Sequence, residues 1–424
     1  MMKFDYRLTR LDNGTRIATA EMPYMQSASV GVWAGVGGRY EPAKFTGISH
    51  FIEHLLFKGT KTRTALKITE AVEGIGGYLN AFTTEDHTCY YAKAGASHLP
   101  DLCDVLSDMY LNSRFAPAEI DREREVIREE IRMYRDNPAQ HVQELLSQTM
   151  WPEHPLGRPL TGTEESISKF KRPHLLGFLR ENYNGRTTIV TVAGKVSHEK
   201  VVAQLKPALG KLPRGAVPRF SRFRVPGGSL KVSLHTQETE QTHLAMGFYA
   251  FGRSDERRYA LKLLSVILGE NMSSRLFQKL REKYGFCYSV QSGMITLADA
   301  GLVNISAGLD TGKLEKAVKV ILQEVGNFCT KPPGRSELRK AQDYTIGQTL
   351  MGLESTTNQM MWLGESLLGH GKILDPSEIE EKIMAVAPRD IQAVACHCLN
   401  RARLGVAIVG PSKDARKIKD WLRG

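Results

Sequence analysis

Two histidines and a glutamate near residue 50 constrain the fold most, because they require one local structure. His50 and His54 are four residues apart, so on an α-helix they lie one turn apart on the same face, where both imidazoles can reach one metal ion. Glu53, beside His54, is then placed to bind a water on that metal or to take its proton. Surface histidine pairs share this spacing, so from these positions alone a metal site and a surface pair both stay open.

Length and composition indicate a globular chain of more than one domain. Its 424 residues are too many for one ordinary core, and a hydrophobic content of 42% with 24% charged residues is typical of globular proteins. No apolar run approaches the ~20 residues that span a bilayer, so we expect no membrane span. The N-terminus lacks the apolar region of a secretory signal.

The six cysteines contain no Cys-x-x-Cys pair, which predicts reduced thiols in a cytoplasmic, bacterial-type compartment. A mitochondrial matrix location stays open if a presequence has been removed. Cys396-His397-Cys398 could suggest a metal cluster, but residues two apart point in different directions on a helix. We therefore expect core thiols there.

The net charge of +11 permits attraction to polyanions. The chain nevertheless shows no aromatic RNA-binding motif and no zinc-finger spacing, so we expect no nucleic-acid partner. The most basic short stretch, 214–224, contains Pro218 and leads into Pro226-Gly227-Gly228. It is interpreted as a solvated linker.

Strand and helix patterns alternate through the first half, which favours an α+β fold. Asp12-Asn13-Gly14 marks a hairpin turn, and Gly76-Gly77 ends a helix that begins near Thr64. The remaining expected elements are strands over 27–36 and 78–93 and helices over 98–113 and 117–135.

The expected helix over 117–135 can supply a third metal ligand. Glu123, Ile127 and Glu130 share one face at helical spacing, so two carboxylates lie among apolar neighbours. Burying a carboxylate is costly unless something compensates its charge, and for Glu130 a metal ion does so best. Glu125 and Glu129 are interpreted as solvated members of surface ion pairs.

These segments together resemble one enzyme family. His50-Phe51-Ile52-Glu53-His54, the strand motif Gly-Gly-x-x-Asn-Ala-x-Thr that begins at Gly76 and ends at Thr83, and the helix Glu123 to Glu130 are similar to the pitrilysin/insulinase (inverzincin) zinc metallopeptidases. The similarity covers nearly the whole chain and is greatest to the short branch that contains mitochondrial processing peptidase (its beta subunit) and bacterial relatives.

The resemblance implies one Zn²⁺ per chain, bound by His50, His54 and Glu130, the last 76 residues after His54. Glu53 would be the general base, and Glu123 would orient a ligand histidine. The expected activity is that of a zinc metalloendopeptidase acting on extended, unfolded peptides or presequence-like segments. A non-catalytic structural or partner subunit of the same family is the alternative; such subunits typically lose the zinc residues, which this chain retains.

The second half repeats the first without the metal ligands. Residues 242–251 resemble the strand 27–36, and the same register places Leu264, Ile267 and Leu268 where His50, Glu53 and His54 stand. We therefore expect two homologous α/β sandwich-like domains, each a mainly antiparallel sheet packed with helices. The expected boundaries are a zinc-binding catalytic domain over 1–212, a linker over 213–228, and a substrate-contacting domain over 229–424.

The family resemblance also implies the substrate contacts. Arg281 and Tyr288 match a pair that reaches the scissile carbonyl, and Asn80-Ala81 matches an edge strand to which a peptide adds as a further strand. Because this chain carries both the zinc residues and the Arg/Tyr pair, a homodimer is expected, with Arg281 and Tyr288 acting in trans.

Overall fold

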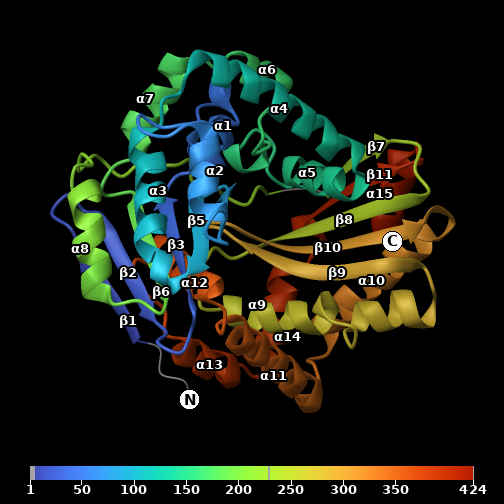
Figure 1. Ribbon diagram of the computed structural model, residues 1–424. Coiled ribbons are helices and arrows are strands. Elements are labelled where there is room, and N and C mark those ends of the chain that lie inside the picture. The colour runs from blue at the N-terminus through green and yellow to red at the C-terminus, as the bar shows by residue number, and fades with distance from the viewer. Residues whose placement is uncertain (1–4, 228–229, 424) are drawn as a thin grey trace. The chain divides into compact units, whose positions relative to one another are not determined.

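The chain forms two compact units that each combine segments from both halves of the sequence. The computed structural model describes residues 5–227 and 230–423 (Figure 1). Unit 1 consists of Met1–Ile131, Arg158–Ser221 and Leu350–Asp375, and unit 2 of Arg132–Gly157, Arg222–Thr349 and Pro376–Gly424. The units thus differ from the contiguous domains 1–212 and 229–424, because each half lends one segment to the other unit. The expected linker has no regular secondary structure over 213–227, and 228 lies outside the described residues.

Unit 1 is built on a six-stranded sheet of order β1-β2-β6-β3-β5-β4, in which only β2 and β6 pair in parallel. The strands are β1 (Asp5–Arg10), β2 (Arg16–Glu21), β3 (Ser27–Ala34), β4 (Tyr78–Thr83), β5 (Thr88–Gly95) and β6 (Thr188–Gly194).

Helices cover both faces of this sheet. On β3, Val30 and Val32 face a core shared with most of the helices, whereas Trp33 faces the single helix α12. The first layer holds α1 (Ile48–Leu56), α2 (Ala65–Glu73), α3 (Leu99–Asn112), α4 (Pro117–Asp136), α6 (Glu164–Ser168), α7 (Arg172–Asn182) and α8 (His198–Leu209). The opposite layer is α12 (Thr356–His370), which comes from the second half of the sequence.

Unit 2 repeats this plan with five strands in the order β7-β11-β8-β10-β9, again with one parallel pair, β7 with β11. The strands are β7 (Lys231–Thr236), β8 (Gln241–Ala250), β9 (Cys287–Thr296), β10 (Gly301–Asp310) and β11 (Leu404–Gly410). In sheet order, β7, β11, β8, β10 and β9 of unit 2 correspond to β2, β6, β3, β5 and β4 of unit 1. The predicted duplication is therefore present in the topology, and the α+β class of two related sheet-and-helix domains is confirmed.

The helices of unit 2 follow the same scheme. One layer holds α9 (Arg258–Ser265), the π-helical η5 (Val266–Glu270) and η6 (Phe277–Lys283), α10 (Leu314–Thr330), α11 (Arg335–Gly352), α13 (Pro376–Ala385), α14 (Pro388–Cys398) and α15 (Ala415–Arg423). The other face is covered by α5 (Pro138–Met150), which comes from the first half. Asn137 caps α5 by accepting from the N–H groups of Ala139 and Gln140, and Pro138 suits its first turn.

The structure also tests the expectations about membrane spans and about the two cysteines of α14. In the described part of the chain, no helix has both the length and the apolar character needed to cross a bilayer. The expectation that both Cys396 and Cys398 are core thiols is correct for Cys398, which is buried, and wrong for Cys396, which is exposed. The reason is that α14 presents only one face to the core, and residues two apart cannot both lie on it.

Candidate metal centre

The start of α1 is held by a buried carboxylate that the sequence analysis missed. Gly47 adopts a left-handed conformation (φ 89°), and a side chain there would meet the backbone of Gly162 at 2.6 Å. Glu41 accepts from the N–H of Gly47 at 2.6 Å and from the N–H of Ser49 at 2.8 Å. Two otherwise unpaired donors of the first turn are thereby satisfied. No capping residue at Gly47 signals this arrangement in the sequence.

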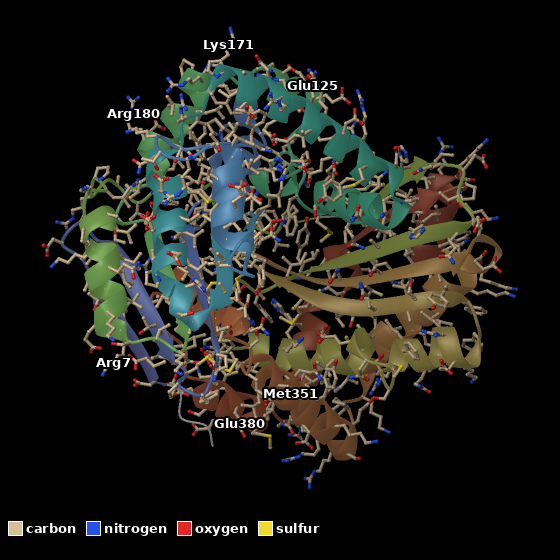
Figure 2. All side chains as sticks on the ribbon, viewed as in Figure 1. Arg7, Glu125, Lys171, Arg180, Met351 and Glu380 are labelled. Carbon is tan, nitrogen blue, oxygen red and sulfur yellow. The ribbon has the colours of Figure 1, made fainter. Side chains whose placement is uncertain are left out.

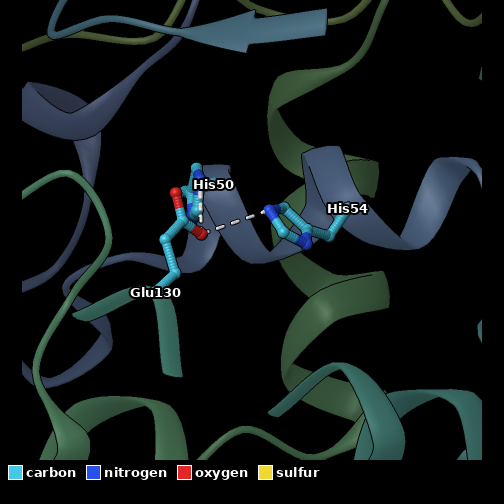
Figure 3. A group of neighbouring side chains, drawn as sticks. All are labelled: His50, His54 and Glu130. Atoms are coloured by element: carbon cyan, nitrogen blue, oxygen red, sulfur yellow. Dashed lines mark ion pairs between the residues drawn. The ribbon is translucent and has the colours of Figure 1, made fainter. Parts of the chain in front are cut away.

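His50, His54 and Glu130 converge as a metal-ligand set (Figure 3). The Nε2 atoms of His50 and His54 lie 3.7 Å and 3.5 Å from Oε2 of Glu130, and all three ligand atoms lie within 4.8 Å of one another. Two ligands at about 2.1 Å from one tetrahedral ion are about 3.4 Å apart, so the set fits zinc. Two imidazoles and one carboxylate leave a coordination position open, as in catalytic zinc sites.

The electrostatics of the set favour a cation. Burial, assisted by the neighbouring His54, lowers the pKa of His50 to about 4, so its ring is neutral and able to bind a metal. Burial also lowers the pKa of His54, but its hydrogen bond with Glu123 and its ion pair with Glu130 outweigh this effect and raise it to about 9. A positive charge beside these carboxylates is therefore stabilised, whether it is a proton on His54 or a metal ion.

Glu123 orients His54 from behind. Its Oε2 lies 3.0 Å from His54 Nδ1, and because a carboxylate only accepts, Nδ1 carries the proton and Nε2 is left for the metal. The other oxygen of Glu123 pairs with Lys58 Nζ at 2.8 Å. Burial raises the pKa of Glu123, but the hydrogen bond from His54 and the ion pair with Lys58 prevail and lower it overall. Lys58 was not foreseen from the sequence.

Glu53 lies near enough to His54 and Glu130 to interact with their charges, and the edge strand holds it in place. Its Oε2 accepts from the hydroxyl of Thr83, at the end of β4, at 2.5 Å. Burial raises the pKa of the Glu53 carboxyl, and the hydrogen bond from Thr83 opposes that rise only in part. A raised pKa suits a carboxylate that must both accept and release a proton near neutrality. Thr83 closes the strand motif that carries the family resemblance, so a signal for it was present.

The structure also places the expected substrate-contacting residues. Asn80 and Ala81 lie on β4, the edge strand of the unit 1 sheet, and the Asn80 side chain accepts from the N–H of Ala81 at 2.8 Å. Glu125 lies on the outside of α4, paired with Arg128 at 2.6 Å (Figure 2).

In unit 2, Arg281 on η6 lies with its guanidinium 5.1 Å from the ring centre of Tyr288 on β9. Both line a cavity of about 390 Å³, and Tyr288 is 76% exposed. The structure thus brings this pair together within unit 2.

The corresponding helix of unit 2 has no chemistry of this kind. Leu264, Ile267 and Leu268 are buried on α9 and η5 and belong to the hydrophobic core. On α11, the buried Leu338, Ala341 and Thr345 repeat the spacing of Ile120, Glu123 and Ile127 on α4, so Ala341 stands where Glu123 does. The positions of both histidines, of Glu53 and of Glu123 are thus apolar in the second half.

A helix-borne His-x-x-Glu-His set completed by a glutamate from a second helix defines a metallopeptidase centre of the inverzincin type. The chain matches the family model "Insulinase (Peptidase family M16)" over residues 16–164 and the model "Peptidase M16 inactive domain" over residues 169–344. The protein belongs to this M16 peptidase family.

Relatives and solved structures agree with this assignment. An uncharacterized zinc protease of Mycobacterium leprae is 38% identical over 98% of this chain and 94% of its own. The zinc protease YmxG of Bacillus subtilis is 35% identical over 94% of this chain and 97% of its own. In fold, the chain is similar to a protease from Helicobacter pylori, with a TM-score of 0.88 at 21% identity over 96% of this chain and 100% of that one. The protein is a zinc metallopeptidase of the M16 family, with Zn²⁺ as its cofactor.

Proposed function

We propose that the protein is a zinc-dependent endopeptidase that hydrolyses peptide bonds in extended, unfolded segments. The observation that carries this proposal is the contact between Glu53 and Thr83, because it joins the proton-accepting group to the end of an edge strand. A peptide added along β4 would pass the carboxylate that activates water.

The chemistry divides among few residues. His50, His54 and Glu130 would hold the zinc ion, which when bound supplies Lewis acidity to water and to the scissile carbonyl. Glu53 accepts the proton of the attacking water and passes it to the leaving amine. Glu123 keeps His54 in the tautomer that binds metal through Nε2.

Strand addition explains the preference for unfolded substrates. The free edge of β4 offers backbone groups to a peptide, and only a segment without its own strand partners can pair with them. The family resemblance adds Arg281, which would hold the substrate backbone, and Tyr288, which would donate to the developing oxyanion. In the proposed homodimer both reach the active site of the other copy.

A quenched, unstructured peptide tests the reaction. We expect zinc at one ion per chain, cleavage that a chelator abolishes and zinc restores, and a fall in kcat of about 10³-fold in Glu53→Gln with its zinc retained. The control is Glu125→Gln, which lies outside the site and should cleave normally. Cleavage that persists after complete zinc removal would contradict the proposal. A zinc-loaded chain that cleaves no peptide would favour the structural-subunit alternative.

Mixing variants tests the dimer. Glu53→Gln lacks the base and Arg281→Ala lacks the substrate contact, so each should be nearly inactive alone. In a mixture, heterodimers carry one intact combination, and up to about a quarter of wild-type activity should return. No activity above that of the separate variants would rule out action in trans.

Cytoplasmic localisation and the choice between presequence-like and other peptides stay predictions.

A further inference from the structure

Two cysteines that are far apart in the sequence meet in unit 2. Cys329 is the next-to-last residue of α10, and Cys396 lies on α14. The Cys396 thiol donates to the carbonyl oxygen of Cys329 at 3.6 Å, and it lies close enough to the Cys329 thiol to raise the pKa of that thiol. Gln392, one turn before Cys396, donates to the same carbonyl at 3.0 Å. The end of α10 is therefore docked on α14 with both sulfurs at the contact.

The two thiols differ in accessibility. Cys396 is exposed, so a small oxidant can reach it directly. Cys329 is half-buried beside the core, and burial with the contact to Cys396 raises its pKa to about 11. Cys398 is buried on the core face of α14. The arrangement is that of an exposed attacking thiol with a protected second thiol beside it.

We propose that Cys329 and Cys396 form a reversible disulfide when the protein meets a peroxide. The Cys396 thiolate attacks the peroxide, so that an S–O bond forms while the O–O bond breaks and hydroxide leaves. The Cys329 sulfur then attacks this sulfenic acid, forming the S–S bond and releasing water. In total, two thiols and one hydrogen peroxide give one disulfide and two waters. A dithiol reductant reverses the step.

The position of the bond gives it a consequence. Between Cys329 and Cys396 the chain leaves unit 2 after Thr349, contributes α12 to unit 1, and returns at Pro376. The disulfide would close a loop of the chain that contains this excursion together with most of α11 and all of α13. Because a cross-link over a long loop restricts the unfolded chain, it stabilises the folded protein against unfolding. The modification is independent of the peptidase reaction and concerns the stability of the fold.

The test treats the zinc-loaded, full-length protein with stoichiometric hydrogen peroxide and maps non-reduced tryptic peptides by mass spectrometry. We expect the chain to lose the mass of two hydrogens, with the peptide containing Cys329 linked to the peptide containing Cys396. Since Cys396 and Cys398 share one tryptic peptide, fragmentation assigns the linked sulfur. The midpoint of thermal unfolding should rise by about 5 °C and return after reduction.

Cys329→Ser and Cys396→Ser are the matched variants, and each should remove both the cross-link and the shift in unfolding temperature. Four results would overturn the proposal: addition of oxygen without a cross-link, a disulfide between two chains, a bond that involves Cys398, or a cross-link in the correct place without a thermal shift. The unfolding temperature of each untreated variant, compared with the reduced wild type, separates loss of the bond from loss of folding.

Discussion

In both units a sheet packs against a helix from the other half of the sequence, but the large and the small residue at one matching contact are reversed. In unit 1, Trp33 on β3 packs against the exchanged helix α12 at Gly364, where a Cβ would overlap the indole ring. In unit 2 the equivalent strand position is Gly247 on β8, and the equivalent helix position is Leu146 on α5, 3.3 Å from a Cβ built on that glycine. The large side chain is on the strand in unit 1 and on the helix in unit 2. Both arrangements suit the same fold because packing constrains the summed volume at a contact.

The helices that carry the site differ in another way. His50, Glu53 and His54 converge on a metal position, whereas Leu264, Ile267 and Leu268 pack into the core. On the second helix of each half, Glu123 is replaced by Ala341. The comparison teaches that the duplicated framework accommodates either a possible metal-ligand set or apolar core residues at matching helix positions.

The largest expected effect comes from making the first half resemble the second. His54→Leu copies Leu268 and removes a ligand, so we expect zinc content to fall from one ion per chain to near zero. Activity should fall about 10³-fold or more, because a bound metal supplies several kcal/mol of transition-state stabilisation. Elemental analysis and peptide cleavage measure both. Leu268→Met, at the matching place, should change neither, and retained zinc in His54→Leu would exclude His54 as a ligand.

A smaller loss is expected from Glu123→Ala, which copies Ala341. Without Glu123, His54 loses the partner that orients its ring, so zinc affinity should fall about 10- to 100-fold. Competition with a fluorescent zinc chelator measures the affinity. Glu125→Ala on the same helix is the control, because its exposed carboxylate pairs with Arg128 at the surface. Equal affinities in the two variants would refute the orienting role.

The packing comparison predicts unequal costs for one added methyl group. Gly364→Ala should lower the free energy of unfolding by about 1–3 kcal/mol, because its Cβ overlaps the Trp33 ring. Gly247→Ala should cost less, about 1 kcal/mol or under, since the nearest atoms lie at 3.2–3.3 Å on flexible leucine side chains. Urea unfolding of both variants measures the difference in the free energy of unfolding. Equal costs would contradict the expected difference between the Trp33 ring and the flexible leucine side chains.

The smallest effect concerns the start of α9, the helix of unit 2 that corresponds to α1. Asp255, at the start of α9, accepts from the backbone and side chain of Arg257, and the side-chain bond is the main cause that lowers the pKa of Asp255. An acid with a lower pKa in the folded state stabilises the fold above its unfolded value of 3.8 and loses that contribution as pH falls below it. Asp255→Asn should therefore cost under about 1 kcal/mol at pH 7 and less near pH 3. Urea midpoints at both pH values measure this, and a cost that grows on acidification would reverse the sign.

Much of the site could be predicted because its parts are local or belong to a family motif. His50, Glu53 and His54 share one helix turn, and Glu130 and Glu123 share one face of another helix, so helical spacing alone groups them. Thr83 was within the quoted strand motif, although its partner was not foreseen. Glu41 and Lys58 could not be predicted, because their contacts depend on how a loop and two helices meet, and residue spacing carries no such information.

The sequence by itself determined the class of fold, the duplication and the candidate metal-ligand residues, since each follows from short-range patterns, from the family resemblance or from the likeness of one half to the other. Only the tertiary structure decided that α5 and α12 are exchanged between the two units, that Glu41 anchors the start of α1, and that Cys396 is exposed beside Cys329. These features depend on which sheet face lacks a cover and which surfaces fit together. That is a property of packed volumes across the whole chain and not of any one segment.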